Sequence, residues 1–210
     1  MARSYRSTVR DEAARATRAR ILATARQLIL SAGYPAFSVV ALADAADVSP
    51  QTIYNAVGGK AQVLKACYDV TLAGDDEPVA MSDRPAFRAL AASGTAGEYS
   101  AAYAHWTRVI YEQVGALLGA VLGPGHGSDA GASELAVTVD RERRVGTTHA
   151  MTAFEQRFGL ADGMTLERAI DIVWTLNSPE VFDRLVHRCG WTLDAYESWL
   201  AHQLRATLLR

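Results

Sequence analysis

Hydrophobic positions recur with helical spacing along most of the chain, and the spacing is most regular between residues 21 and 64. At the start of this region, apolar residues occupy i, i+1, i+4, i+7 and i+8, as in a helix with one buried face. They are Ile21, Leu22, Ala25, Leu28 and Ile29. Gly33 follows, a residue suited to the left-handed conformation that ends many helices. The pattern predicts a helix over about residues 17–32.

Two serines mark the starts of two further short helices. Ser49 is a preferred N-cap residue, and Pro50 fits the first helical position because its missing N–H would have no partner there. Ser38 is the corresponding cap candidate upstream. The helices that follow are predicted at residues 39–46 and 50–57.

Hydrophobic pairs flank both of these predicted N-termini. The residue before each cap and the fourth residue of each helix can close a hydrophobic staple, which fixes the angle at which the chain enters the helix. The pairs are Phe37 with Leu42 and Val48 with Ile53. Because only residues 47–49 join the two helices, the spacing is that of a helix-turn-helix motif.

The second of these helices separates polar from apolar side chains. At about 100° per residue, one arc contains Gln51, Thr52, Tyr54 and Asn55, and the opposite arc contains Ile53, Ala56 and Val57. The apolar arc has to pack, so the polar arc faces solvent. Gln and Asn can pair bidentately with adenine, Thr can contact the thymine methyl group, and a Tyr hydroxyl can reach a phosphate. The inventory is typical of a DNA recognition helix.

The chain changes character between Gly74 and Pro85, where charged residues and prolines interrupt the apolar pattern. A domain boundary is predicted there, with a DNA-binding domain at residues 1–73 and an effector-binding and dimerisation domain at residues 74–210. Helical periodicity then predicts helices at about residues 98–122, 133–158, 166–174 and 181–186, and a last one after Thr192. The Gly-rich run that starts at Gly123 predicts a mobile loop through Gly131. With no strand-like alternation of useful length, the predicted class is all-α.

Charge is distributed unevenly along the 210 residues. Residues 1–70 contain nine Arg or Lys and five Asp or Glu, a net charge of +4, whereas residues 71–210 have a net charge of −6. A basic N-terminal region suits DNA, since binding to DNA is largely electrostatic. Arg3, Arg6 and Arg10 precede the first predicted helix. They either form an arm that enters the minor groove or belong to a frayed, solvated terminus.

Composition and motifs exclude several other classes of protein. The polar, Arg-rich N-terminus does not resemble a signal peptide, and no apolar run is long enough to span a bilayer, so a cytoplasmic protein is expected, associated with the nucleoid when bound to DNA. Cys67 and Cys189 lack metal-ligand spacing and are expected to be reduced thiols. No phosphate-binding loop, zinc motif or nucleophile–base pair is recognisable, so we expect no catalytic residues, no metal and no cofactor.

The residues of the N-terminal region, in their order along the chain, resemble those of the TetR-like bacterial transcriptional regulators over about 50 residues. The residues that carry the resemblance are Arg18, Ile21, Leu22, Ala25, Gly33, Tyr34, Ser38, Val39, Leu42, Ala43, Val48, Ser49, Thr52, Ile53, Tyr54, Lys60 and Leu64. The resemblance implies a helix-turn-helix domain joined to a helical bundle that binds a small molecule and dimerises.

Roles for individual residues follow from this resemblance. Gln51, Thr52 and Asn55 would contact base edges or the nearby backbone, and Ser38, Tyr54 and Lys60 would hold phosphates; Ser49 completes the predicted DNA-binding set. The chain departs from the family where Gly58-Gly59-Lys60-Ala61 replaces a Ser-Lys-Glu-like helix start. The capping hydroxyl and the capping-box carboxylate are both missing there, so the start of the fourth helix should be less well fixed.

Two further sets of residues are candidates in the C-terminal region. An effector pocket needs mostly apolar walls and a few polar groups, and its candidates are Tyr103, Trp106, Tyr111, His149 and Phe154. The alternative is that the aromatic residues are core and the polar ones are solvated. The last two helices have larger aromatic faces than one protomer requires, and in the family they form a dimer interface; the candidates are Trp174, Phe182, Trp199, Leu200 and Leu204.

The sequence therefore predicts a homodimeric repressor. It would bind a palindromic operator with two recognition helices about 34 Å apart, and a small-molecule effector would release it. The alternative is a helical binding or adaptor module of the same fold that has lost sequence-specific DNA binding.

Overall fold

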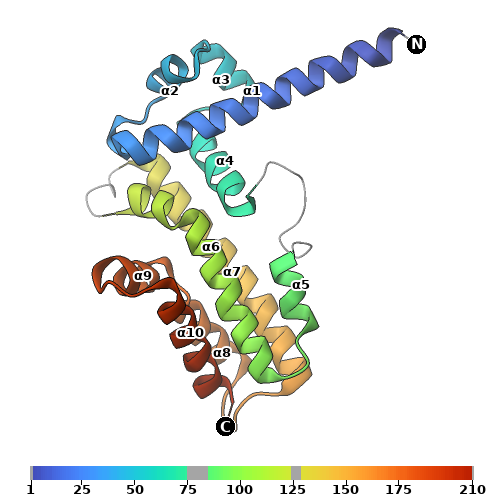
Figure 1. Ribbon diagram of the computed structural model, residues 1–210, viewed down its shortest axis with the longest axis vertical. Helices are drawn as coiled ribbons and strands as arrows, with labels where there is room; N and C mark the ends of the chain where they lie inside the picture. The colour runs from blue at the N-terminus through green and yellow to red at the C-terminus, as the bar shows by residue number, and fades with distance from the viewer. Residues whose placement is uncertain (1, 75–84, 124–128, 210) are drawn as a thin grey trace. The chain divides into compact units, whose positions relative to one another are not determined.

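The computed structural model describes residues 2–74, 85–123 and 129–209, and every regular element in these ranges is helical, which confirms the all-α class (Figure 1). The segment between Gly74 and Pro85, and residues 124–128 of the predicted loop with His126, lie outside the described residues. The predicted extension of that loop through Gly131 is wrong, because a helix begins at Ala130. The elements are α1 (Ala2–Ala32), η1 (Tyr34–Ala36), α2 (Val39–Ala46), α3 (Pro50–Ala56), α4 (Lys60–Ala73), α5 (Pro85–Ala92), α6 (Ala96–Leu122), α7 (Ala130–Phe158), α8 (Leu166–Leu176), α9 (Pro179–Phe182), η3 (Asp183–Arg188) and α10 (Leu193–Leu208).

The chain forms two compact units, and the division does not fall at a single point. The N-terminal unit contains residues 1–77 and 116–136, and the C-terminal unit contains residues 78–115 and 137–210. The end of α6 and the start of α7 therefore group with the helix-turn-helix region. Both helices continue into the C-terminal unit, whereas the predicted functional boundary at residue 74 rests on composition alone.

The N-terminal unit is built on α1, which packs against η1, α2, α3 and α4 (Figure 1). The predicted apolar face of α1 is buried at Ile21, Leu22, Ala25 and Ile29. From the two predicted staples, Phe37, Leu42 and Ile53 are buried and Val48 is half-buried. The helical periodicity of the sequence thus identified the core of this unit.

Both predicted serine caps are present. The Ser38 hydroxyl accepts the N–H of Ala41 at 3.0 Å, and the Ser49 hydroxyl accepts the N–H of Thr52 at 3.1 Å. Each such cap contributes about 1 kcal/mol to stability. Asp47 makes the tight turn between the two helices with a φ of 52°. The predicted bounds of α2 are confirmed, and α3 ends one residue earlier than predicted.

The predicted start of the first helix near residue 17 is wrong, because α1 begins at Ala2. The segment before residue 17 is rich in Ala and Arg and contains no Gly or Pro. These residues have high helix propensity, so the helix can continue towards the N-terminus without an apolar face of its own. The absence of apolar periodicity before residue 17 indicates that this segment has no buried face. It does not exclude a helix.

In the C-terminal unit, α6 and α7 run side by side (Figure 1). The hydroxyl of Tyr99 on α6 donates to the carbonyl of Ala150 on α7 at 2.8 Å. Thr192 caps α10 as predicted, accepting the N–H of Ala195 at 3.1 Å. The helix predicted at residues 181–186 is different in kind, because α9 ends at Phe182 and the chain continues as the π-helical turn η3. None of the described helices combines the length and apolar composition needed to cross a membrane.

Candidate functional site

The polar face of α3 is largely exposed, and on its apolar face Ile53 is buried while Ala56 and Val57 are half-buried. Tyr54 is 53% exposed and Ile53 is fully buried. Gln51 and Asn55 are exposed, while Thr52 is half-buried. This arrangement agrees with the face separation predicted from the helical repeat. The structure therefore places four side chains suited to base and phosphate contacts on one surface.

Hydrogen bonds within the helix hold these side chains in order. The side-chain amide of Gln51 donates to the Asn55 oxygen at 2.9 Å. The hydroxyls of Ser49 and Thr52 lie 2.8 Å apart. Ser49 therefore acts first as the cap of α3, and its hydroxyl is oriented by Thr52.

The far end of α3 is tied to α1. The guanidinium of Arg18 donates to the carbonyl oxygen of Ala56 at 3.2 Å. A cation at a helix C-terminus satisfies a free carbonyl and interacts favourably with the helix dipole. Arg18, which carries part of the family resemblance, is thus a structural support of the recognition helix.

Lys60 lies within a cluster of ionised and polar groups. Its ammonium is 2.8 Å from the carboxylate of Asp129 and 4.5 Å from the ring centre of Tyr34. The hydroxyl of Tyr34 donates to the same carboxylate. The hydrogen bonds from Lys60 and Tyr34 hold the pKa of Asp129 well below its usual range. The predicted phosphate-contacting residue is therefore an intramolecular ion-pair partner in this structure.

Tyr34 and Asp129 are absent from the predicted site set. In the sequence, Tyr34 is notable only as one of the residues behind the family resemblance. The only local feature that marks Asp129 is its position as a carboxylate directly before a helix. It accepts the N–H groups of Gly131 and Ala132 at 2.9 and 3.1 Å, and so caps α7. Its partner Lys60 is 69 residues away in sequence, and no periodicity relates two such positions.

The five predicted effector-pocket residues are not all in one place. Tyr103 and Phe154 are fully buried, and Tyr111 stacks on Phe182 with ring centres 4.7 Å apart. Trp106 is half-buried and packs edge-on against Tyr103, with the ring centres 5.7 Å apart. His149 is exposed. Three of the aromatic residues are thus core of the C-terminal unit, and their role towards an effector stays a prediction.

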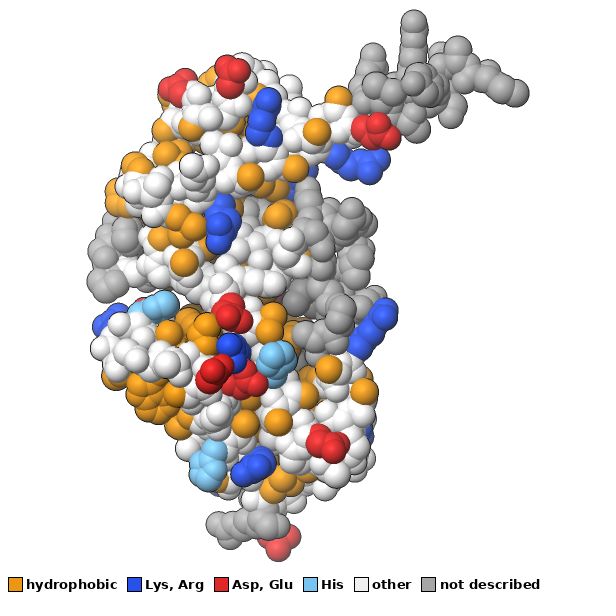
Figure 2. Space-filling model, in the orientation of Figure 1, with side chains coloured by type: hydrophobic (Ala, Val, Ile, Leu, Met, Phe, Trp, Pro, Cys, Tyr) orange, Lys and Arg blue, Asp and Glu red, His pale blue; other side chains and the backbone are white. Residues whose placement is uncertain are grey.

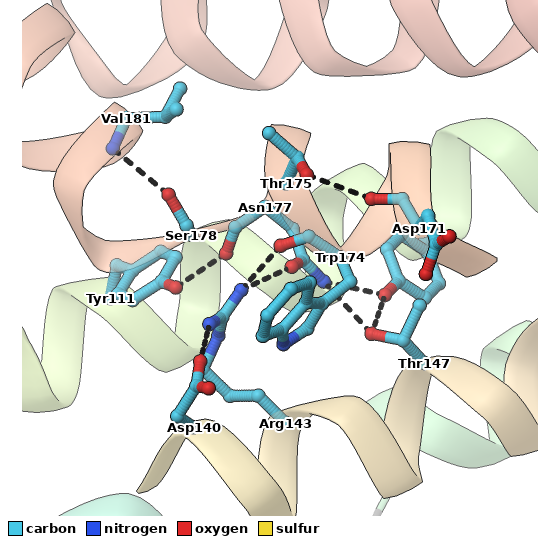
Figure 3. Close-up of polar contacts among 11 residues, drawn as sticks. Tyr111, Asp140, Arg143, Thr147, Asp171, Trp174, Thr175, Asn177, Ser178 and Val181 are labelled. Carbon is cyan, nitrogen blue, oxygen red and sulfur yellow. Dashed lines mark hydrogen bonds and ion pairs between the residues drawn. The ribbon is translucent and has the colours of Figure 1, made fainter. Parts of the chain in front are cut away.

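A buried polar network surrounds Asn177 at the end of α8 (Figure 3). Its amide donates to the Tyr103 hydroxyl at 2.6 Å, and its side-chain oxygen accepts from Arg143 at 2.7 Å. The Tyr111 hydroxyl donates to its backbone carbonyl at 2.5 Å. Thr147, also buried, lies 3.3 Å from the Tyr103 hydroxyl. The network joins α6, α7 and α8 through polar groups.

Two buried donors near this network have no hydrogen-bond partner among the described residues. They are the indole Nε1 of Trp174 and the hydroxyl of Tyr196. Burial raises the pKa of Tyr196, and the nearby Tyr103 adds to the rise. Buried polar groups are normally hydrogen-bonded, and these two donors are exceptions among the described residues. The sequence pattern did not single out Asn177 or Arg143.

The predicted dimer residues divide into two kinds. Phe182, Leu200 and Leu204 are buried inside their own protomer. Trp174 and Trp199 are half-buried. Trp191, which the sequence analysis did not include, is 36% exposed and lies 6.2 Å from Trp199 between ring centres.

Charged side chains of both signs lie close together on one face of the C-terminal unit (Figure 2). In this unit, Arg108 of α6 pairs with Asp194 and Glu197 of α10, at 2.5 and 3.0 Å. His105 is 3.2 Å from Glu197. These residues pair with one another and connect two helices. They are therefore explained as surface ion pairs.

The capped helices α2 and α3, joined by a tight turn and with exposed polar side chains on α3, have the arrangement of a helix-turn-helix regulator. Residues 21–67 match the family model for bacterial regulatory proteins of the tetR family, which confirms the predicted family resemblance. This segment of the chain is therefore similar to the N-terminal region of tetR-family regulators. Among curated protein sequences, none matches it.

Two solved structures share the fold across nearly the whole chain. One is NalD, the secondary repressor of the MexAB-OprM multidrug efflux pump in Pseudomonas aeruginosa, with a TM-score of 0.70 and 18% identity over 94% of this chain and 98% of that one. The other is the fatty acid degradation regulator FadR from Bacillus halodurans, with a TM-score of 0.64 and 16% identity over 89% and 93%. The similarity therefore extends beyond residues 21–67 at the level of fold.

Proposed function

We propose that this protein is a transcriptional repressor that binds a palindromic operator as a homodimer and is released by a small-molecule effector. The observation that carries the proposal is the exposed face of α3, with Gln51, Tyr54 and Asn55 outward and Ile53 buried. The net charge of +4 over residues 1–70 supports the same function. The two similar structures, a repressor and a metabolic regulator, add support from fold.

Binding to the DNA directly upstream of its own gene tests the proposal. The affinity should fall steeply as salt rises, because phosphate contacts release counterions, and it should exceed the affinity for scrambled DNA of the same length. A protein that binds both DNAs equally weakly would support the alternative, a helical adaptor module without sequence-specific binding.

We place the effector among α6, α7, α8 and α10 of the C-terminal unit. The two unpartnered donors, Trp174 Nε1 and Tyr196 OH, support this placement, because a ligand acceptor could complete their hydrogen bonds. The half-buried Trp106 would supply apolar contact next to Tyr103. Candidate compounds can be screened by release of the protein from its operator, with Tyr196→Phe as the variant that should respond more weakly.

We place the dimer interface on the half-buried aromatic surface of α8 and α10, at Trp174 and Trp199. Leu200 and Leu204 support this surface from inside the protomer. Trp199→Ala should weaken association in sedimentation experiments while the protomer stays folded. Leu200→Ala should instead lower the unfolding temperature, since it leaves a cavity in the core.

A further inference from the structure

We propose that Asp129 positions the recognition helix region by fixing Lys60 and Tyr34, and that Lys60 serves as the counter-ion of Asp129 instead of contacting DNA phosphate. The proposal rests on the proposed DNA-binding function, and it revises the role of one predicted contact. We call these three residues the Asp129 cluster; all of them belong to the N-terminal unit.

The carboxylate of Asp129 accepts hydrogen bonds from four groups. Lys60 donates to one oxygen at 2.8 Å, and the Tyr34 hydroxyl and the N–H groups of Gly131 and Ala132 donate to the other. Hydrogen bonds to an ionised acceptor are about twice as strong as neutral ones. The carboxylate is thus fully used within the protein.

Close packing brings the first turns of α7 and α4 together. A Cβ added to Gly131 would lie 3.3 Å from the Tyr34 hydroxyl and 3.8 Å from the Cα of Ala61. Only a residue without a side chain fits this approach comfortably. The ion pair is therefore part of a packed contact and not an isolated surface pair.

The environment of Lys60 disfavours a second role as a phosphate contact. Its ammonium is held by the carboxylate and lies over the Tyr34 ring, an arrangement that adds a cation–π attraction. To reach a phosphate, the ammonium of Lys60 would have to break its ion pair with Asp129, and the ionised carboxylate would then lack its cation. The exchange of one anion for another brings little electrostatic gain.

The position of the cluster explains what it would stabilise. Lys60 is the first residue of α4, and it follows Gly58 and Gly59, which offer no capping side chain. Tyr34 lies in η1, directly before α2. The cluster thus holds the chain on both sides of the helix-turn-helix segment against α7. At the start of α4 it does so where no side chain caps the helix.

The decisive measurement is operator affinity as a function of NaCl concentration for the full-length protein. The variants are Lys60→Gln, Asp129→Asn and the double variant. Each single change should weaken binding about tenfold, in the usual range of coupling between sites, and the double variant should be no weaker than either single one. The slope of log affinity against log salt should match the wild-type slope.

A matched control exists on the same helix. Lys65 also pairs with a carboxylate, Asp69, and its side chain has the same 33% exposure as Lys60. Lys65→Gln removes one positive charge without touching the Asp129 cluster, and it should leave affinity within about twofold of wild type because exposed ion pairs contribute little.

Two results would overturn the proposal. If Lys60 neutralised a DNA phosphate, Lys60→Gln would reduce the salt slope by about 0.9, and a reduction of that size would show that Lys60 binds DNA. Tighter binding by Asp129→Asn would show that Asp129 competes with DNA for Lys60.

Unfolding measurements separate this proposal from the proposed function. In urea, the effects of Lys60→Gln and Asp129→Asn should be non-additive, as expected for residues in direct contact. If the wild-type protein does not bind its upstream DNA, the proposed function fails, and non-additive unfolding would still establish the structural cluster. Additive effects on unfolding would overturn the cluster itself.

Discussion

The side-chain amide of Gln51 donates a hydrogen bond of 2.9 Å to the side-chain oxygen of Asn55, one helical turn away. Both side chains are exposed on α3. The pair pre-orders the two amides that are best suited to adenine, and it leaves the Asn55 amide nitrogen available to donate.

Removing this pair should weaken operator binding without unfolding the protein. We expect Gln51→Ala/Asn55→Ala to lose at least about 30-fold in affinity, since each of the two base contacts contributes about 1–3 kcal/mol. Urea unfolding should change by less than about 0.5 kcal/mol, because both sites are exposed. Gln27→Ala, an exposed glutamine on α1, is the control. Unchanged affinity in the double variant would contradict the assignment of α3 as recognition helix.

The two glycines before α4 should respond oppositely to the same substitution. Gly58 has a φ of +126°, and an added Cβ would lie 2.8 Å from the Cβ of Gln62, so Gly58→Ser should cost about 1–3 kcal/mol. Gly59 has extended N-cap geometry, and Gly59→Ser supplies the missing cap, with an expected gain of up to about 0.5 kcal/mol. Urea titrations measure both. Equal effects would contradict this account of the α3–α4 turn.

The buried network around Asn177 should be sensitive to loss of its central amide. Asn177→Leu removes one hydrogen-bond partner each from the Tyr103 hydroxyl and the Arg143 guanidinium, and we expect a loss of about 1–3 kcal/mol in unfolding free energy. The same change at exposed Asn55 should alter stability by less than about 0.5 kcal/mol. If Asn177→Leu is as stable as wild type, the polar network is not a stabilising element.

The two cysteines should differ strongly in reactivity. Cys67 is 1% exposed, and burial raises its pKa to about 11, whereas Cys189 is exposed. Because thiolates are the reactive species, a thiol reagent at pH 8 should modify one cysteine in the folded protein, and mass spectrometry should locate it at Cys189. In Cys189→Ser, modification should wait for opening of the N-terminal core. Equal rates at both thiols would contradict the packing around α4.

Acid should weaken the contribution of Asp129. Its pKa is lowered in the folded protein by Lys60 and Tyr34, from an ordinary value of 3.8. A lowered folded-state pKa stabilises the fold above the unfolded value, and the contribution is lost as pH falls towards the folded value. The stability difference between wild type and Asp129→Asn should stay constant from pH 8 to about pH 5 and shrink below about pH 4. A difference that persists at pH 3 without shrinking would contradict an ionised Asp129.

Local chemistry made much of the N-terminal region predictable. The caps at Ser38 and Ser49 act on amides three residues away, and the face of α3 follows from a fixed rotation per residue. Such interactions span one helical turn, so both partners lie within the same short stretch of sequence. The start of α1 was missed because a helix without an apolar face leaves no periodic signal.

Long-range contacts were not predictable in the same way. The partner of Lys60 lies 69 residues away, and the amide of Asn177 meets a hydroxyl 74 residues away. Nothing in the local pattern states which distant polar groups will meet, because their pairing depends on how helices pack.

By itself the sequence determined the all-helical class, the helix-turn-helix bounds and the outward face of α3, because these depend on capping and on the helical repeat. Only the tertiary structure decided that Lys60 pairs with Asp129 and that Leu200 and Leu204 fill their own protomer's core. Periodicity shows that one face of a helix is apolar. Whether that face meets the same chain or a second copy depends on the packing of elements far apart in sequence.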